Sequence, residues 1–405
     1  MNRFSLPFAL LGLIILGAVS CSKNTDTPSN ADTGSTSPTG TYPNISTAFG
    51  TTINLNSLAN YANQAKPNYI VKDNTGANPI TNAKATLGRV LFYDKSLSIN
   101  NSVSCSSCHK QQFAFGDTAL VSSGVVGGVT SRHSMRLVNS RFGTEAKFFW
   151  DERAATLELQ TTQPIQDHAE MGFSGQAGRG TLATLLTKLQ GIGYYNELFK
   201  FVYGDITVTE ARLQESLAQF IRSIQSFDSK YDAGRAQVNN DNQPFPNFSA
   251  LENTGKILFL TPPNFDTQGN RISGGLGCNG CHNAPEFDID PNTRNNGIIG
   301  NANAAGIDVT NTRAPSLRDL VNNAGVVNSP MMHTGALKTL QNVIGHYGNI
   351  TIAPGNNNLD NRLRPNGVGQ KLQLTANEVD AVVAFIKTLA GTNVYTDAKW
   401  GNPFK

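Results

Sequence analysis

The chain is poor in charge, in cysteine and, after its first residues, in long apolar runs. Charged residues make up 15% of the 405 residues, and the net charge is only +3. Because this charge is small and dispersed, we expect no nucleic-acid partner. No segment beyond residue 21 is long and apolar enough to cross a bilayer. Only Cys21 lies outside two short cysteine motifs, which argues against a disulfide framework.

Residues 1–21 predict an export signal. Arg3 precedes a short apolar run, and small residues lead to Cys21, as in a lipoprotein signal that leaves a lipid on this cysteine. The alternative is a plain secretory signal, since Ala18 stands where leucine is usual. Residues 22–50 are polar and predict a flexible tether. We therefore expect a protein on the periplasmic side of a bacterial membrane, anchored there by lipid or secreted into the periplasm.

Two C-x-x-C-H motifs contain the other four cysteines. Two thiols at this spacing reach the two vinyl groups on one porphyrin edge, and the next histidine then lies under the iron. The motifs predict two covalently bound haem c groups. Their residues are Cys105, Cys108 and His109 in the first motif, and Cys278, Cys281 and His282 in the second.

Other chemistry explains these cysteines less well. A four-cysteine zinc site would join pairs about 170 residues apart and leave His109 and His282 unexplained. A thioredoxin-like pair is seldom followed by histidine and would not occur twice. Structural disulfides suit an exported chain, but each cysteine of the mature part lies in one of the two motifs. The histidines are therefore predicted to be iron ligands.

The chain predicts a mainly helical fold with long loops. Apolar residues recur at helical spacing in 80–98, 206–234, 249–259 and 375–391. Thr207 with Glu210, Ser249 with Glu252, and Thr375 with Glu378 have capping-box spacing.

A polar connection, 236–248, separates two halves that contain one haem motif each. We expect two cytochrome c-like domains, an N-terminal one over 51–235 and a C-terminal one over 236–405, with one haem each.

The chain resembles the bacterial dihaem cytochrome c peroxidases and MauG proteins. The motifs that support this resemblance are "LGRVLFYDKSLS", "FFWDERAATLELQTTQPIQDHAEMG", "RAPSLRDL" and "PMMHTGALKTLQNVIGHY". In that family an open side of the first haem iron does chemistry, while the second haem transfers electrons.

The resemblance implies four catalytic residues in the middle motif. Trp150 would lie between the haems, and Gln160, Pro164 and Glu170 would line the open side of the first haem. Chemistry agrees for Glu170, because a carboxylate in a partly dry pocket can take and return the proton of a peroxide. The alternatives are core packing for Trp150 and a solvated helix-start carboxylate for Glu170. No histidine occurs in 122–131, where several peroxidases have one that blocks the first iron.

The far ligand of the second iron is predicted to be Tyr347. This position has methionine in the usual peroxidase and tyrosine in MauG. His346, one residue earlier, is the alternative ligand. A phenolate favours the oxidised iron and a thioether the reduced iron, so this choice affects the function.

The resemblance also implies one calcium ion between the haems, bound through backbone carbonyls. The corresponding residues here are His133, Asn328 and Pro330. Backbone ligation tolerates a change of side chain, so calcium stays an expectation.

The function expected is that of an oxidoreductase that reduces hydrogen peroxide with electrons from a small cytochrome c or cupredoxin. The first alternative is a MauG-like enzyme that oxidises side chains of a partner protein, and the second is a dihaem electron carrier without catalysis. Dimerisation is common in the relatives, so a homodimer is a further expectation.

Overall fold

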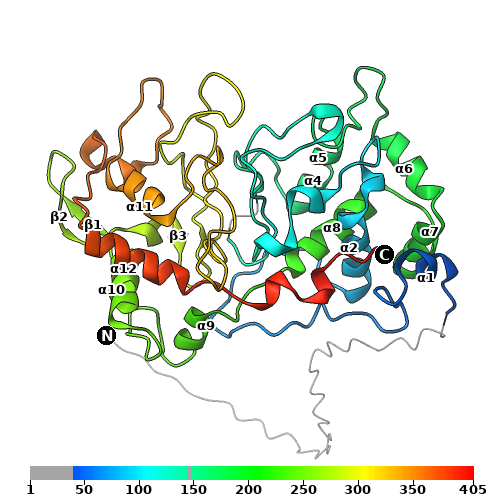
Figure 1. Cartoon of the computed structure of the whole chain (residues 1–405), viewed down its shortest axis with the longest axis horizontal. Coiled ribbons are helices and arrows are strands. Elements are labelled where there is room, and N and C mark those ends of the chain that lie inside the picture. The colour runs from blue at the N-terminus through cyan, green and yellow to red at the C-terminus, as the bar shows by residue number, and fades with distance from the viewer. Residues whose placement is uncertain (1–39, 145–146) are drawn as a thin grey trace, which may run out of the picture. The chain divides into compact units, whose positions relative to one another are not determined.

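Short helices joined by long loops make up the protein (Figure 1). The computed structural model describes residues 40–144 and 147–405. The mainly helical fold is confirmed. The predicted signal and the lipidation site Cys21 lie outside the described residues. The helices are α1 Pro43–Phe49, α2 Asn82–Tyr93, α3 Cys105–Cys108, α4 Leu157–Thr161, α5 Gln163–Gln166, α6 Leu182–Gln190, α7 Gly193–Tyr203, α8 Glu210–Ser223, α9 Lys230–Arg235, α10 Ala250–Leu260, α11 Leu340–Gly348 and α12 Ala376–Lys387.

Two closely packed helix pairs, α2 with α8 and α10 with α12, support the two cysteine motifs (Figure 1). Each pair approaches so closely because a glycine lies at the contact. A Cβ at Gly88 of α2 would lie 1.9 Å from the carbonyl oxygen of Ser216. A Cβ at Gly255 of α10 would lie 1.9 Å from that of Ala381. In both halves the glycine-bearing helix precedes the cysteine motif along the chain.

Two large clusters of buried apolar side chains and one small one, Ile350 with Leu359 and Leu363, form the core of the described residues. The first contains residues of α2, α7 and α8, and the second contains residues of α9, α10 and α12. The C-terminal segment returns to the first cluster, where Val394 and Trp400 are buried. The Tyr93 hydroxyl donates to the Trp400 carbonyl at 2.7 Å, and Arg89 Nε donates to the Gly401 carbonyl at 2.7 Å. The predicted domain boundary at 235/236 stays a prediction.

Strands are short and lie in the C-terminal half. Strands β1 Pro263–Phe265 and β2 Arg271–Gly274 pair antiparallel, as do β3 His282–Asn283 and β4 Asp288–Ile289. The second pair begins at the histidine of the second cysteine motif and pairs it with Ile289. Among the described residues, no helix meets the length and hydropathy that a membrane span requires.

Two expectations about local structure are wrong. The tether was expected to reach residue 50, but Pro43–Phe49 forms α1, and Ile45 and Phe49 are buried in the first cluster. The helix expected over 206–234 begins at Glu210 and ends at Ser223. Its cap is Thr209, whose side chain accepts from the Arg212 amide, and not Thr207.

Side chains from the flanking loops explain why this helix is short. Asp205 accepts from the Thr207 amide at 2.8 Å and pairs with Arg212, which holds the preceding residues in a turn. After the helix, Asn139 exchanges two hydrogen bonds with the backbone of Ser226. By contrast, the capping boxes at Ser249 and Thr375 are confirmed.

We expect Gly88→Ala and Gly255→Ala each to lower the free energy of unfolding by about 2–3 kcal/mol, because the added methyl group forces the helix pair apart. Gly345→Ala in α11 is the matched control, since nothing lies within 4 Å of its Cβ position. Denaturant unfolding of the three variants measures the effect. Equal stabilities would contradict the close helix contacts.

Candidate active site

The first cysteine motif opens onto a cavity of about 180 Å³. Helix α3 provides the two cysteines, and His109 directly follows it. Trp150 lies in the loop before α4, Gln160 in α4, Pro164 in α5 and Glu170 in the loop after α5. The structure thus brings together side chains that are up to 65 positions apart in the chain. The predicted residues that line this cavity are Cys105, Cys108, His109, Trp150, Gln160, Pro164 and Glu170.

His109 is oriented as a metal ligand would be. Its backbone amide donates to the Cys105 carbonyl at 3.0 Å, which closes the turn of the motif. Its Nδ1 lies 3.2 Å from the Phe115 carbonyl, and because a carbonyl only accepts, Nδ1 carries the proton. Nε2 then keeps its lone pair, as metal-binding histidines require. The donor set of this cavity, with two free thiols beside this imidazole, fits a haem c.

Glu170 is held at the cavity by contacts of its backbone. Its amide donates to Asp167 Oδ1 at 3.0 Å, and its carbonyl accepts from the Val125 amide at 3.0 Å. The loop with Val125 comes so near because Gly124 has no side chain, and a Cβ there would lie 1.9 Å from the Ala169 carbonyl oxygen. This is the loop that lacks a blocking histidine.

Burial changes the acidity of Glu170. Desolvation, helped by the charge of Asp167, raises the pKa of Glu170 to about 7, against the smaller opposite effect of Arg153. The carboxyl is therefore divided between its neutral and ionised forms near neutral pH. A group of this kind can both accept and donate a proton during one reaction cycle.

The second cysteine motif opens onto a cavity of about 400 Å³, and Cys278, Cys281 and His282 line it. Burial raises the pKa of the Cys278 and Cys281 thiols to about 12, so they are not reactive thiolates. Burial lowers the pKa of His282 to about 4, which keeps its imidazole neutral. This donor set also fits a haem c.

Of the two neighbouring residues Tyr347 and His346 on α11, only Tyr347 lines the second cavity. Tyr347 lines the second cavity, whereas His346 is not among its lining residues and its Nε2 donates to the Asn296 carbonyl at 2.8 Å. The Asn296 side-chain amide donates to the Tyr347 hydroxyl at 3.2 Å. Burial raises the pKa of Tyr347, so without a bound cation the phenol keeps its proton.

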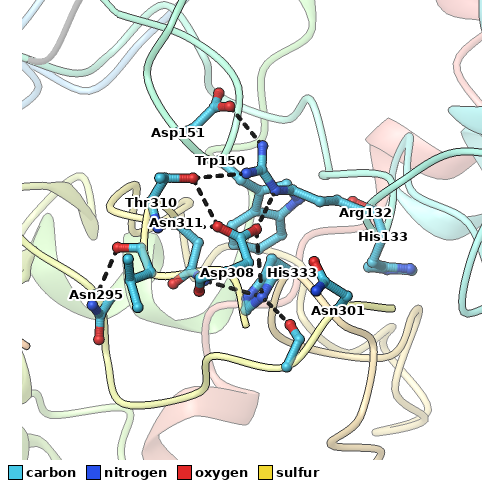
Figure 2. Close-up of polar contacts among 12 residues, drawn as sticks. Arg132, His133, Trp150, Asp151, Asn295, Asn301, Asp308, Thr310, Asn311 and His333 are labelled. Atoms are coloured by element: carbon cyan, nitrogen blue, oxygen red, sulfur yellow. Dashed lines mark hydrogen bonds and ion pairs between the residues drawn. The ribbon is translucent and has the colours of Figure 1, made fainter. Parts of the chain in front are cut away.

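Trp150 lines both cavities. Its indole Nε1 donates to the His133 carbonyl at 2.7 Å, and its own carbonyl accepts from the amides of Thr312 at 2.8 Å and Arg313 at 3.0 Å. His133 in turn donates its amide to the His333 carbonyl at 2.7 Å. Figure 2 shows the indole beside His333, with ring centroids 6.3 Å apart. Residues of both halves of the sequence therefore hold this ring.

An ion-pair cluster surrounds the tryptophan (Figure 2). Arg132 binds Asp308 and Asp151, each at 2.7 Å, and donates to the Thr310 hydroxyl at 2.9 Å. Although burial opposes ionisation, the hydrogen bonds from Arg132 and Thr310 lower the pKa of Asp308 to about 2. The cluster joins Arg132 and Asp308, which are 176 positions apart, and it lowers the pKa of both carboxyl groups, so that both stay charged.

The residues expected to bind calcium lie in different surroundings. His133 and Pro330 line the second cavity, and Asn328 lines neither cavity. The His133 carbonyl already accepts the indole N–H, and the Asn328 side-chain amide donates to the Asp319 carbonyl and the Tyr395 hydroxyl. Calcium stays a prediction at this point.

Three polar or sulfur-containing residues that line the cavities were not predicted from the sequence. Arg136 lines both cavities, and Asn296 and Met332 line the second. The Asn296 amide lies 3.0 Å from Met332 Sδ as well as near Tyr347. An arginine between the apolar residues Met135 and Leu137 is a pattern that could have pointed to Arg136. No sequence pattern connects Asn296 with Tyr347.

Comparison with known proteins agrees with this geometry. Residues 82–240 match the family described as di-haem cytochrome c peroxidase. The chain is 29% identical to the methylamine utilization protein MauG of Methylophilus methylotrophus over 78% of this chain and 84% of that protein. It is 26% identical to cytochrome c551 peroxidase of Nitrosomonas europaea over 76% of this chain and 80% of that protein.

Solved structures show the same fold. A MauG-like protein associated with microbial copper homeostasis superposes with a TM-score of 0.64 at 27% identity, over 84% of this chain and 99% of that chain. The diheme peroxidase BthA of Burkholderia thailandensis superposes with a TM-score of 0.58 at 20% identity, over 82% and 93%.

The similarity to these relatives shows an oxidoreductase that acts on peroxide. The resemblance to the dihaem cytochrome c peroxidase and MauG family is confirmed, and this similarity implies two c-type haems.

We expect Tyr347→Phe in the haem-loaded protein to change the electron paramagnetic resonance signal of the low-spin haem, because the phenol oxygen would be lost from the second cavity. His346→Gln is the control, since His346 bonds to a backbone carbonyl instead of lining the cavity. A changed signal in the histidine variant and an unchanged one in the tyrosine variant would refute the assignment.

Proposed function

We propose that the protein reduces hydrogen peroxide to water at the first cavity, with electrons from a small cytochrome c or cupredoxin that enter through the second. The observation that supports this best is Glu170, a carboxyl with a pKa of about 7 in the cavity of the first cysteine motif. When bound, the haem iron supplies the electrons and the Lewis acidity that peroxide reduction requires.

Glu170 moves the proton. Its carboxylate takes a proton from one oxygen of hydrogen peroxide and returns it to the other oxygen, which leaves as water. Two electrons and two protons convert each peroxide to two waters. Gln160, on the same cavity, orients the peroxide through its side-chain amide. Pro164 has no amide hydrogen and keeps that part of the wall apolar.

Trp150 connects the two cavities as an electron relay. This residue lines both cavities, its indole N–H donates to the His133 carbonyl, and its backbone carbonyl accepts two amide hydrogen bonds. Because the indole N–H is bonded to a carbonyl, the ring loses an electron without having to move.

The remaining parts of the proposal concern the whole chain. Two cytochrome c-like domains, 51–235 and 236–405, would hold one haem each. A lipid on Cys21 would keep the protein at the periplasmic side of the membrane. The protein would form a homodimer, as its relatives commonly do.

A second candidate is a MauG-like enzyme that oxidises side chains of a partner protein. Tyr347 in the second cavity favours it, because a phenolate stabilises oxidised iron and makes that haem a poor electron acceptor. Rapid peroxide turnover with a small reduced cytochrome or copper protein would favour the peroxidase. Absence of turnover with such donors, together with retained reaction with peroxide, would favour the MauG-like activity.

We expect Glu170→Gln to lower the rate of reaction with peroxide by about 100-fold or more, the usual contribution of a general acid–base group. Glu215→Gln is the control, because Glu215 pairs with Lys84 and lines neither cavity. Stopped-flow spectroscopy of the haem-loaded variants gives the rates. Unchanged rates in the Glu170 variant would exclude this residue as the proton carrier.

Stability separates this effect from misfolding. Since burial raises the pKa of Glu170, its ionised form destabilises the folded state as pH rises from the unfolded value of about 4.3 through 7. The neutral amide should therefore be at least as stable as the carboxylate at pH 8.

We expect the peroxide rate to rise as pH passes about 7, because the carboxylate of Glu170 is the form that accepts the proton. Asp167→Asn removes a charge that raises this pKa and should move the midpoint to lower pH. Arg153→Gln removes a charge that lowers it and should move the midpoint to higher pH. Shifts in the same direction would show that another group controls the profile.

A further inference from the structure

Arg136 lies between the two cavities and lines both of them. It lies three residues after His133, whose carbonyl accepts the Trp150 indole N–H. Its Nε is buried and has no hydrogen-bond partner. The guanidinium of Arg136 therefore has a free N–H donor, and this residue lines both cavities.

The partners of Arg136 are neutral. Within the part of the chain that the structure describes, Nη2 donates to the Ser316 carbonyl at 2.9 Å, and Nη1 lies 3.4 Å from the Ser329 hydroxyl. Burial lowers the pKa of Arg136 to about 10 against the smaller opposite effects of Asp319 and Tyr395, so the guanidinium is still charged at neutral pH. Buried cations are normally paired with an anion, and none of the ion pairs of the described residues includes this one.

The neighbouring arginines have different partners. Arg132 is neutralised by Asp151 and Asp308. Arg313 also lines both cavities, and its contacts are likewise neutral, because its guanidinium lies 4.9 Å from the Phe148 ring centre and donates to the Lys147 carbonyl. Arg136 differs from Arg313 in its Nε, which is buried without a hydrogen-bond partner.

Arg136 is a neighbour of the residues that are expected to bind calcium. Ser329, which its guanidinium contacts, stands between Asn328 and Pro330 in the chain, and His133 is three residues before Arg136. These three residues are the expected carbonyl donors. A divalent cation there would share a dry space with a guanidinium, and the two positive charges would repel each other.

We propose that Arg136 supplies the positive charge between the two haem sites in place of a calcium ion, and that its guanidinium binds the carboxylate groups of the cofactors. The inference rests on the proposed placement of one haem c in each cavity. Haem carries two propionate carboxylates, and guanidinium donates to carboxylates in pairs of short, charge-assisted hydrogen bonds. No other ligand is needed to satisfy the unpaired Nε.

The first test is the metal content of the haem-loaded protein. Elemental analysis after dialysis should find far less than one calcium per chain, and a calcium chelator should leave the visible spectrum and both midpoint potentials unchanged. One tightly held calcium per chain, with a change in spectrum when it is removed, would overturn the proposal.

The second test is the redox behaviour of variants. Arg136→Gln should lower both midpoint potentials and make them more dependent on pH, because a nearby cation favours the reduced haem and keeps the carboxylates ionised. Arg136→Lys, which retains the charge, should lie close to the unaltered protein. Arg212→Gln is the control, since it removes the same charge from a surface pair with Asp205. Potentials in Arg136→Gln equal to those of the control would refute the proposal.

These readouts do not depend on peroxide turnover. Loss of turnover with the expected potentials and metal content would count against the proposed function alone. Should Arg136→Gln fail to fold, the metal analysis and Arg136→Lys still decide the question.

Discussion

The hydrogen bonds of Trp150 are the constraint on which the arrangement of the two cavities depends. The indole donates to the carbonyl of His133, and the tryptophan carbonyl accepts the amides of Thr312 and Arg313. These partners come from distant parts of the chain, so the same residue fixes the spacing of both cavities. The ion pairs of Arg132 with Asp151 and Asp308 add a second connection at the same place. A ring held in this way can pass charge between two cofactors without moving.

One closely packed helix pair supports each cysteine motif, α2 with α8 the first and α10 with α12 the second. A glycine in α2 and another in α10 allow backbone contact with α8 and α12, which a side chain would prevent. Long loops then carry the residues with chemical roles. The loop with Gly124 is one example, because its close approach to Ala169 places the Glu170 backbone. Closely packed helix pairs and loops together position side chains that belong to segments with little regular secondary structure.

The two cavities differ in their electrostatics although their cysteine motifs are alike. Burial leaves Glu170 divided between two protonation states in the first cavity, which suits proton transfer. Burial in the second cavity keeps the Tyr347 phenol protonated unless a cation binds it. Between them lies the guanidinium of Arg136, which forms no ion pair within the described residues and has an unpartnered Nε. The proposed division between a reactive site and an electron-transfer site would follow from the polar residues around the motifs.

Local patterns in the sequence determined the cysteine motifs, the mainly helical fold and the helix starts at Ser249 and Thr375, because each depends on residues a few positions apart. Family resemblance added Trp150, Gln160, Pro164 and Glu170, which the structure brings to one cavity. The helix that begins at Glu210 was predicted with the wrong cap, because Thr207 and Thr209 are both possible caps. Asp205 accepts from the Thr207 amide and holds Thr207 in a turn, so Thr209 is the cap. Only the tertiary structure decided that Tyr347 and not its neighbour lines the second cavity, and that Arg136 lies between the cavities with neutral partners. Those facts depend on contacts between segments that are far apart in the chain, where no spacing rule applies.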